Sequence, residues 1–102
     1  MKIQFSIILP CFNESDNIIE LYNELLSLEI GVNNAEIIFV NNGSTDDTEE
    51  KIDKIINTSS NTKNLNFFIT KLNLKNNLGY GGGIVAGLKI AKGECIGWTH
   101  AD

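Results

Sequence analysis

Short apolar runs, separated by longer amphipathic stretches, recur along the chain. Four of these runs are almost continuously apolar, and two are rich in Ile, Val and Phe. Runs of this kind are typical of strands covered on both faces, as in a parallel sheet. The predicted strands are Phe5–Leu9, Ile37–Val40, Leu65–Ile69 and Cys95–Trp98.

Helical patterns occupy the intervals between the predicted strands. Apolar residues recur there at helical spacing, and capping residues or glycine mark the ends. The predicted helices run from Asn13 or Ser15 to about Leu28, from the capping pair Ser44 and Asp47 past Ile56, and from about Gly83 to Lys92. The order βαβαβαβ predicts an α/β fold, a parallel sheet with helices on both faces.

The composition limits what the chain can bind. A chain of 102 residues has room for one domain, and no apolar run approaches the ~20 residues of a membrane span. The net charge is -5, and all eight basic residues are Lys. This balance argues against a nucleic-acid binder, which needs a basic face to neutralise phosphates. Without Arg, an anion would be held by backbone N–H groups, Lys or a metal ion.

The two cysteines, Cys11 and Cys95, lie far apart, each in an apolar run. We interpret both as buried free thiols of a protein in the reducing cytoplasm. Together with His100 they supply too few ligands for a zinc site. Trp98, in the last apolar run, is predicted to belong to the core.

Polar and glycine-rich segments follow the four predicted strands. These segments are Pro10–Glu14, Asn41–Ser44, Asn77–Gly83 and Thr99–Asp102. In a parallel α/β sheet the carboxyl ends of the strands share one edge, and ligands bind beyond it. Each segment alone could be only a turn or a cap, but four of them on one edge predict a ligand-binding site.

The glycine-rich segment also allows a different function. Gly81, Gly83 and Ala86 match the dinucleotide fingerprint G-x-G-x-x-[GA], and Asp102 lies at about the distance of its ribose-binding acid. That fingerprint follows its strand directly, whereas about ten residues separate Ile69 from Gly81. An NAD-binding module of an oxidoreductase therefore stays open as an alternative, as does a non-enzymatic α/β interaction domain.

The four segments together resemble a known family. "SIILPCFNESDNI", "EIIFVNNGSTDDT", "NLGYGGGIVAGLKIAKGE" and the closing "HAD" resemble the N-terminal half of an inverting family 2 glycosyltransferase in order and spacing. The most similar subgroup includes dolichyl-phosphate mannose synthase-like and polyprenyl-phosphate sugar transferases. The resemblance implies a partial GT-A fold, which is a Rossmann-like parallel sheet that binds a nucleotide-diphospho-sugar.

The resemblance also implies roles for individual residues. The P-x-[YF]-N-E motif, which lines the nucleotide pocket, is matched by Pro10, Phe12, Asn13 and Glu14. Asn41 and Asn42 stand where the family usually has two Asp residues, one of which reads the nucleobase. An Asn side chain can still hydrogen-bond a base edge, because it carries both an acceptor and donors.

Glycine, histidine and acidic positions complete the implied site. Gly79, Gly81 and Gly82 match the loop near the ribose and phosphates, where the backbone approaches the ligand. His100 and Asp102 stand where the family has Asp-x-Asp. The last Asp of that motif holds Mg²⁺ or Mn²⁺, so Asp102 is the implied metal ligand. His100 is placed with the nucleotide-sugar site, and His is acceptable to Mn²⁺.

The implied enzyme transfers a sugar from a UDP- or GDP-linked donor to a polyprenyl phosphate or a glycan, as in cell-envelope polysaccharide synthesis. No residue of the chain matches the family's catalytic base. We therefore expect residues 1–102 to be a truncated, inactive nucleotide-binding part of a longer protein, in the cytoplasm or at the cytoplasmic face of the membrane. The last strand would lack its covering helix, so self-association through an exposed apolar face is also expected.

Overall fold

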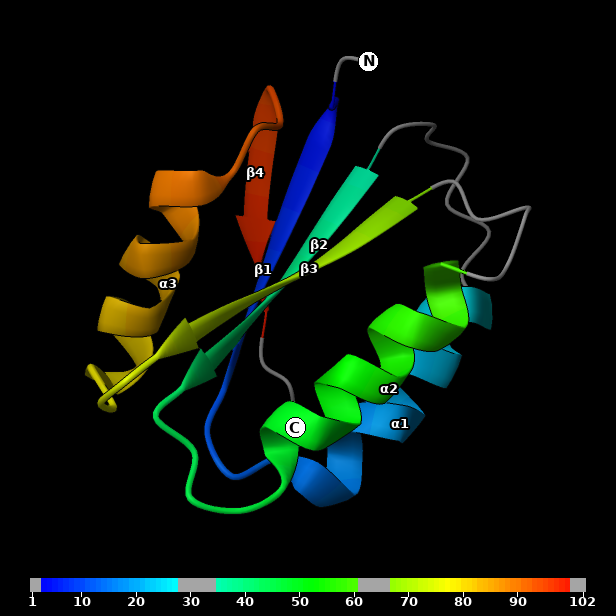
Figure 1. Ribbon diagram of the computed structural model, residues 1–102. Coiled ribbons are helices and arrows are strands. Elements are labelled where there is room, and N and C mark those ends of the chain that lie inside the picture. The colour runs from blue at the N-terminus through cyan, green and yellow to red at the C-terminus, as the bar shows by residue number, and fades with distance from the viewer. Residues whose placement is uncertain (1–2, 28–34, 61–66, 100–102) are drawn as a thin grey trace.

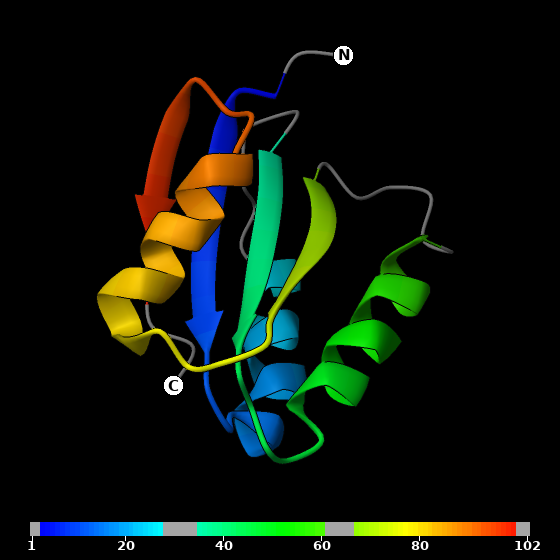
Figure 2. The ribbon, with the colours of Figure 1, turned by 60° about the vertical axis from the view of Figure 1, so that its left-hand side comes forward.

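The computed structural model describes residues 3–27, 35–60 and 67–99, in which strands and helices alternate. The elements are β1 (Phe5–Cys11), α1 (Ser15–Ser27), β2 (Ala35–Asn42), α2 (Thr48–Ser60), β3 (Phe67–Leu74), α3 (Gly79–Ile90) and β4 (Cys95–Trp98). The strands form one parallel sheet in the order β3-β2-β1-β4. Helices α1 and α2 cover one face and α3 covers the other (Figure 1 and Figure 2). The predicted α/β fold is confirmed.

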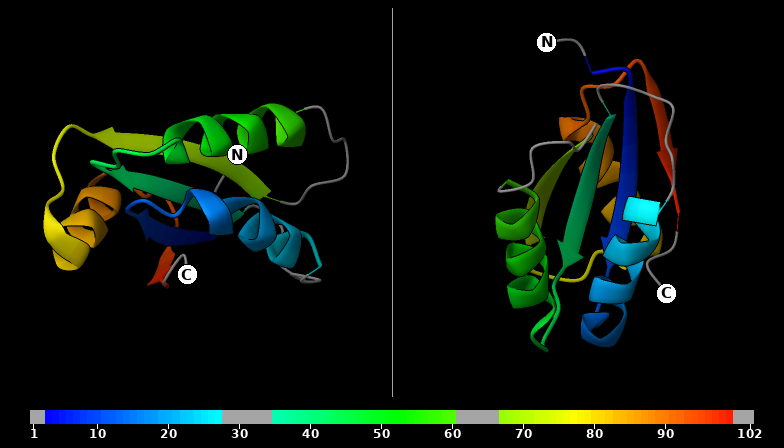
Figure 3. Two further views of the ribbon diagram at one scale, coloured as in Figure 1. Left: turned by 90° about the horizontal axis from the view of Figure 1, so that it is seen from below. Right: turned by 90° about the vertical axis from the view of Figure 1, so that its right-hand side faces the viewer.

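The core lies on both sides of β1 and β2. Beneath α1 and α2, which lie side by side (Figure 3), a buried cluster contains Leu9, Cys11, Ile18, Tyr22, Ile37, Phe39, Ile52 and Ile55. On the opposite face, a second cluster contains Ile8, Ile38 and Val40. Burial on both faces explains why β1 and β2 are continuous apolar runs in the sequence.

Helix α3 approaches the sheet closely because one of its glycines faces Ile8. A Cβ atom added at Gly87 would lie 2.6 Å from Ile8 Cγ2 and 3.2 Å from both Ile8 Cγ1 and Cδ1. Ile8 is fully buried on β1, between β2 and β4. The position of α3 therefore depends on the absence of a side chain at residue 87.

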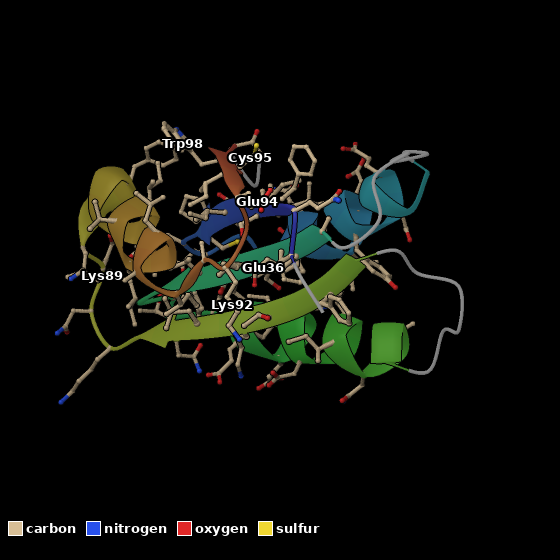
Figure 4. The ribbon with its side chains drawn as sticks, turned by 90° about the horizontal axis from the view of Figure 1, so that it is seen from above. Glu36, Lys89, Lys92, Glu94, Cys95 and Trp98 are labelled. Carbon is tan, nitrogen blue, oxygen red and sulfur yellow. The ribbon has the colours of Figure 1, made fainter. Side chains whose placement is uncertain are left out.

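A buried carboxylate fixes the turn from α3 to β4. Glu36 Oε2 accepts hydrogen bonds from Ser6 Oγ and from the backbone N–H of Lys92, both at 2.6 Å. The hydroxyl oxygen of Ser6 accepts the N–H of Gly93 at 2.8 Å. Figure 4 shows Glu36 and Lys92 where this turn meets the sheet. The sequence pattern did not indicate this contact, because the Glu occupies an otherwise apolar strand.

Strand β3 differs most from its prediction, Leu65–Ile69. It continues to Leu74, because its second half alternates between the two faces of the sheet. Leu72 packs with the α3-side cluster, while Lys71 and Asn73 form hydrogen bonds to Glu49 of α2 on the other face. The prediction required a continuous apolar run, and an edge strand with one partly polar face does not provide one. Residues 65–66 lie outside the described residues.

Smaller boundary differences have local causes. β1 and β2 extend to Cys11 and Asn42, beyond the apolar runs, because the parallel ladder continues there. Helix α2 begins at Thr48 rather than near Ser44. The Asp46 carboxylate accepts the Thr48 N–H at 2.9 Å and thereby caps the helix at this later residue.

Strand β4 lies at an edge of the sheet, and two predictions made for it are wrong. Trp98 is 56% exposed and does not belong to the core, and Cys95 is exposed rather than buried (Figure 4). The cause is the strand order, which puts β4 at the edge of the described sheet, where no described helix covers its faces as α3 covers β1 and β2. Cys11 is the buried free thiol that was predicted, and desolvation raises its pKa to about 12.

None of the helices in the described ranges is long and apolar enough to cross a membrane.

Candidate functional site

The carboxyl ends of the parallel strands share one edge of the sheet (Figure 2). The structure brings the segments 10–14, 41–44 and 77–83 to this edge. The fourth predicted segment contains His100 and Asp102, which lie outside the described residues. Within residues 3–27, 35–60 and 67–99, no group of three or more His, Cys, Asp and Glu side chains could hold a metal ion.

Asn13 ties the loop after β1 to the loop after β2. Its side-chain Oδ1 accepts the backbone N–H groups of Thr45 at 2.8 Å and Asp46 at 3.3 Å. Its own backbone N–H donates to Ser44 Oγ at 3.0 Å. Asn13 has a φ of 52°, a left-handed conformation that Asn adopts more readily than most residues. In this structure the Asn13 side chain therefore shapes the edge by holding two loops together.

Glu14 marks the beginning of α1. Its carbonyl oxygen accepts the N–H groups of Asn17 and Ile18, and its carboxylate accepts Asn17 Nδ2 at 2.8 Å. Its backbone N–H donates to Thr48 Oγ1 at 3.0 Å, which connects it to the start of α2. The Ser15 hydroxyl likewise donates to Asp47. These contacts hold the N-termini of both helices beside the sheet edge.

Phe12 is an aromatic residue at this edge, as is Tyr80 in the first turn of α3. Phe12 is 43% exposed, although Cys11 before it and Pro10 are buried. An exposed aromatic ring can stack on a nucleobase, an interaction worth roughly 1–3 kcal/mol per base in nucleic-acid complexes. Of the predicted pocket motif, Phe12 is thus the side chain most open to a flat ligand.

Asn42 uses both ends of its amide to hold the segment before α3. Its Oδ1 accepts the N–H of Leu78 at 2.9 Å, and its Nδ2 donates to the carbonyl oxygen of Gly79 at 2.8 Å. A Cβ atom at Gly83 would lie 3.0 Å from Asn42 Nδ2 and 3.2 Å from Pro10 Cβ. Pro10, Asn42 and Gly83 therefore set how closely the start of α3 approaches the ends of β1 and β2.

The glycine-rich segment is helical, whereas the sequence predicted a loop. Helix α3 begins at Gly79, which has a φ of 79°, and includes Gly81, Gly82 and Gly83. The Asn77 side chain accepts the Gly79 N–H at 2.7 Å and stabilises this start. The absence of acidic residues from the first turn leaves the positive end of the helix dipole unopposed within α3.

Asn41 carries an unpaired polar atom inside the protein. Asn41 is 6% exposed, and its Nδ2 donates to Asn73 Oδ1 at 3.1 Å. Its buried Oδ1 has no hydrogen-bond partner among the described residues. Buried polar atoms are almost always hydrogen-bonded, and leaving one unpaired costs roughly 1–3 kcal/mol. One of the two positions that were predicted to read the nucleobase, Asn41, therefore holds an acceptor that lacks a donor.

A polar network that the sequence analysis did not identify leads from Asn41 to α2. Asn73 Nδ2 donates to Glu49 Oε2 at 2.6 Å, and Lys71 Nζ lies 2.8 Å from the same oxygen and 2.7 Å from Asp53 Oδ1. The hydrogen bonds from Lys71 and Asn73 lower the pKa of the Glu49 carboxyl. Those to Asp53 and Glu49 raise the pKa of Lys71. The alternation of Lys71 and Asn73 with leucines was the signal for this polar face of β3.

A parallel α/β sheet with polar loops and a glycine-rich helix at its carboxyl edge defines a class of ligand-binding proteins. The sequence model described as Glycosyl transferase family 2 matches residues 6–102. The chain therefore belongs to glycosyltransferase family 2, as the resemblance indicated.

Two curated proteins agree with this family. The chain is 34% identical over 99 residues to CsbB of Bacillus subtilis (strain 168), whose name gives it provisionally as a glycosyltransferase. It is 31% identical over 103 residues to sll0501 of Synechocystis sp., an uncharacterized glycosyltransferase. The matches cover 95% and 100% of this chain, but only 28% and 30% of the two relatives. The chain thus spans less than a third of their length.

Solved structures show the same fold. S. aureus TarS, residues 1–349, in complex with UDP-GlcNAc matches with a TM-score of 0.77 and 30% identity, over 98% of this chain and 27% of that 1–349 chain. The mannosyltransferase PcManGT of Pyrobaculum calidifontis, in complex with GDP-Man and Mn²⁺, matches with a TM-score of 0.85 and 22% identity, over 100% of this chain and 28% of PcManGT. The described sheet and helices therefore form part of a GT-A fold.

Proposed function

We propose that this chain is the nucleotide-sugar-binding part of a glycosyltransferase and that it takes a UDP- or GDP-linked donor. The observation that carries the proposal is that the polar segments 10–14, 41–44 and 77–83 meet at one sheet edge, with the aromatic Phe12 exposed there. The Phe12 ring would stack on the base, and Asn41 or Asn42 would hydrogen-bond its edge. The nucleotide-sugar complexes of TarS and PcManGT support this choice of ligand.

The phosphates would lie toward the start of α3. Asn42 and Pro10 hold this helix close to the ends of β1 and β2, and Gly81 has no neighbouring heavy atom within 4 Å of an added Cβ. The first backbone N–H groups of a helix lack partners within the helix and attract anions. This arrangement would bind phosphate through backbone groups, which suits a chain without Arg.

We propose Asp102 as a ligand for Mg²⁺ or Mn²⁺, with His100 beside it at the nucleotide-sugar site. Carboxylate oxygen is the usual ligand for both ions, and the Mn²⁺ in the PcManGT complex supports a divalent cation. Such a cation, when bound, would neutralise the charge that develops on the departing nucleoside diphosphate.

For the whole protein we propose inverting transfer of the sugar to a lipid phosphate or a saccharide at the cytoplasmic face of the membrane. Residues 1–102 would be its N-terminal donor-binding part and would have little activity alone. The catalytic base and the acceptor site would lie in further sequence, which is consistent with the relatives being more than three times as long as the matched region.

The test is a ¹H–¹⁵N NMR titration of the chain with UDP, GDP and NAD, each with and without Mg²⁺. We expect one nucleoside diphosphate to shift the backbone signals of residues 12–14, 41–43 and 102, more strongly with Mg²⁺. Shifts caused by NAD alone, around residues 81–86, would contradict the proposal and favour a dinucleotide-binding module. Binding of neither class by a well-dispersed chain would favour an interaction domain.

A further inference from the structure

We propose that Glu36 is a positioning residue, which fixes the register of β4 and with it the point from which the chain leaves β4 toward Asp102. This inference rests on the proposed function of Asp102 and adds to it a residue that acts without touching the ligand. Glu36 stands near the start of β2, at the opposite end of the sheet from segments 10–14, 41–44 and 77–83. Any effect of its carboxylate on the site must therefore pass through β4.

Strand β4 has little side-chain packing with which to fix its own register. All four of its residues are exposed, Trp98 at 56% and Ile96 at 41%. A Cβ atom added at Gly97 would meet no heavy atom within 4 Å. The register of a strand is strongly specified where one of its faces is buried, and weakly specified elsewhere. The backbone hydrogen bonds between β4 and β1 would also form after a shift of two residues, so another contact must select the observed register.

The contacts of Glu36 hold the turn that precedes β4. Glu36 is 6% exposed, and its Oε2 accepts the backbone N–H of Lys92 and the hydroxyl of Ser6, both at 2.6 Å (Figure 4). Ser6 Oγ in turn accepts the N–H of Gly93 at 2.8 Å, just before β4 begins. A Cβ atom added at Gly93 would lie 2.6 Å from both N and Oγ of Ser6, so the turn rests directly on β1. A shift of β4 would pull the turn away from these partners.

The far end of β4 carries this register to the site. The N–H of Cys95 donates to the Gln4 carbonyl oxygen at 3.0 Å, and the N–H of Thr99 donates to that of Ile8 at 3.2 Å. Asp102 follows Thr99 by three residues, which span at most roughly 11 Å of extended chain. A shift of two residues would move Thr99 by roughly 6–7 Å along β1. Because a Mg²⁺–oxygen bond is only ~2 Å long, such a shift would change which cation positions Asp102 can reach.

Amide hydrogen exchange of the folded chain, followed by NMR, would test the register directly. The variants are Glu36→Ala and Glu36→Gln, and the control is Ile55→Val, which weakens the core beneath α1 and α2, away from β4. In Glu36→Ala, exchange at Cys95 and Thr99 should speed up about tenfold or more relative to β2, because the turn loses its acceptor. Glu36→Gln should restore slow exchange, because both bonds go to Oε2 and the Gln carbonyl can take its place.

Isothermal titration calorimetry with UDP and with GDP, each with and without Mg²⁺, would test the effect on the site. For the nucleotide that binds, Glu36→Ala should lose most of the gain in affinity that Mg²⁺ brings to the unmodified chain. Its affinity without Mg²⁺ should stay the same, because Asn42 still holds the start of α3. Glu36→Gln and Ile55→Val should keep the gain. A purely structural role would weaken binding with and without Mg²⁺ alike, which would overturn the inference.

Two further outcomes would overturn the inference and leave the proposed function standing. Unchanged exchange at Cys95 and Thr99 in Glu36→Ala would show that α3 and residues 91–94 hold β4 in place without Glu36. Faster exchange with an undiminished gain from Mg²⁺ would show that the register of β4 does not matter to the cation. If Mg²⁺ brings no gain to the unmodified chain, the proposed role of Asp102 fails and this inference fails with it.

Discussion

The close approach of α3 to the sheet makes a quantitative prediction about two glycines of the same helix. At Gly87 an added Cβ would lie 2.6 Å from Ile8 Cγ2, closer than Cβ contacts occur in proteins, whereas at Gly81 it would meet no heavy atom within 4 Å. Ile8 is β-branched, fully buried and on an interior strand, so it has little freedom to move away. The two substitutions to Ala should therefore have opposite effects on stability.

The magnitudes follow from two effects. Replacing Gly by Ala inside a helix stabilises it by roughly 0.5–1 kcal/mol, and this gain applies at both positions. Overpacking a well-filled core costs roughly 1–3 kcal/mol, and this cost applies at Gly87 alone. Because the helix contribution cancels, the free energies of unfolding of Gly81→Ala and Gly87→Ala should differ by about 1–3 kcal/mol.

Urea denaturation followed by far-UV circular dichroism would measure this difference, with the unmodified chain as reference. With an m-value of about 1–3 kcal/mol/M, the unfolding midpoints of the two variants should differ by roughly 1 M. Gly81→Ala should unfold at a higher urea concentration than the unmodified chain. Equal midpoints for the two variants would refute the reasoning, because they would show that α3 does not rest against Ile8 at this distance.

Four further predictions concern polar and ionisable groups. Asn42→Ala should lower the free energy of unfolding by about 1–3 kcal/mol in the same assay, because two hydrogen bonds to the start of α3 are lost; an unchanged midpoint would contradict this. A thiol reagent at pH 8 should modify Cys95 rapidly and Cys11 only after unfolding, as counted by mass spectrometry; fast labelling of both in the native chain would contradict the burial of Cys11. The pKa of Cys11 is raised in the folded chain, so its thiol contributes stability that is fully present below the ordinary pKa of 9.0 and is lost as the pH rises toward about 12. Unfolding measured over this pH range should show the loss of stability in the unmodified chain and not in Cys11→Ala. The pKa of Glu49 is lowered in the folded chain, so its contribution to stability is present above the ordinary Glu pKa and is lost as the pH falls through its pKa in the folded chain. Lys71→Met should reduce this loss of stability in acid. An unchanged dependence of the unfolding free energy on acid pH would count against the ion pair.

The sequence alone was sufficient for the order and type of the elements. Continuous apolar runs in β1 and β2 reflect burial on both faces, which is a local property that each strand carries in its own residues. Helical spacing identified three helices, and their alternation with strands required parallel pairing. From parallel pairing alone it followed that the segments after the strands share one edge, which is how the site segments 10–14, 41–44 and 77–83 were found.

The tertiary structure decided strand order and hydrogen-bond partners. Trp98 and Cys95 are exposed because β4 is at an edge, and no pattern within four residues specifies which strand lies next to it. Asn13, Asn41 and Asn42 look alike in the sequence, yet one joins two loops, one carries an unpaired oxygen and one holds the start of α3. An amide can donate or accept, so its role depends on the register that places partners such as Asn73 opposite it, and register arises only when the strands pair.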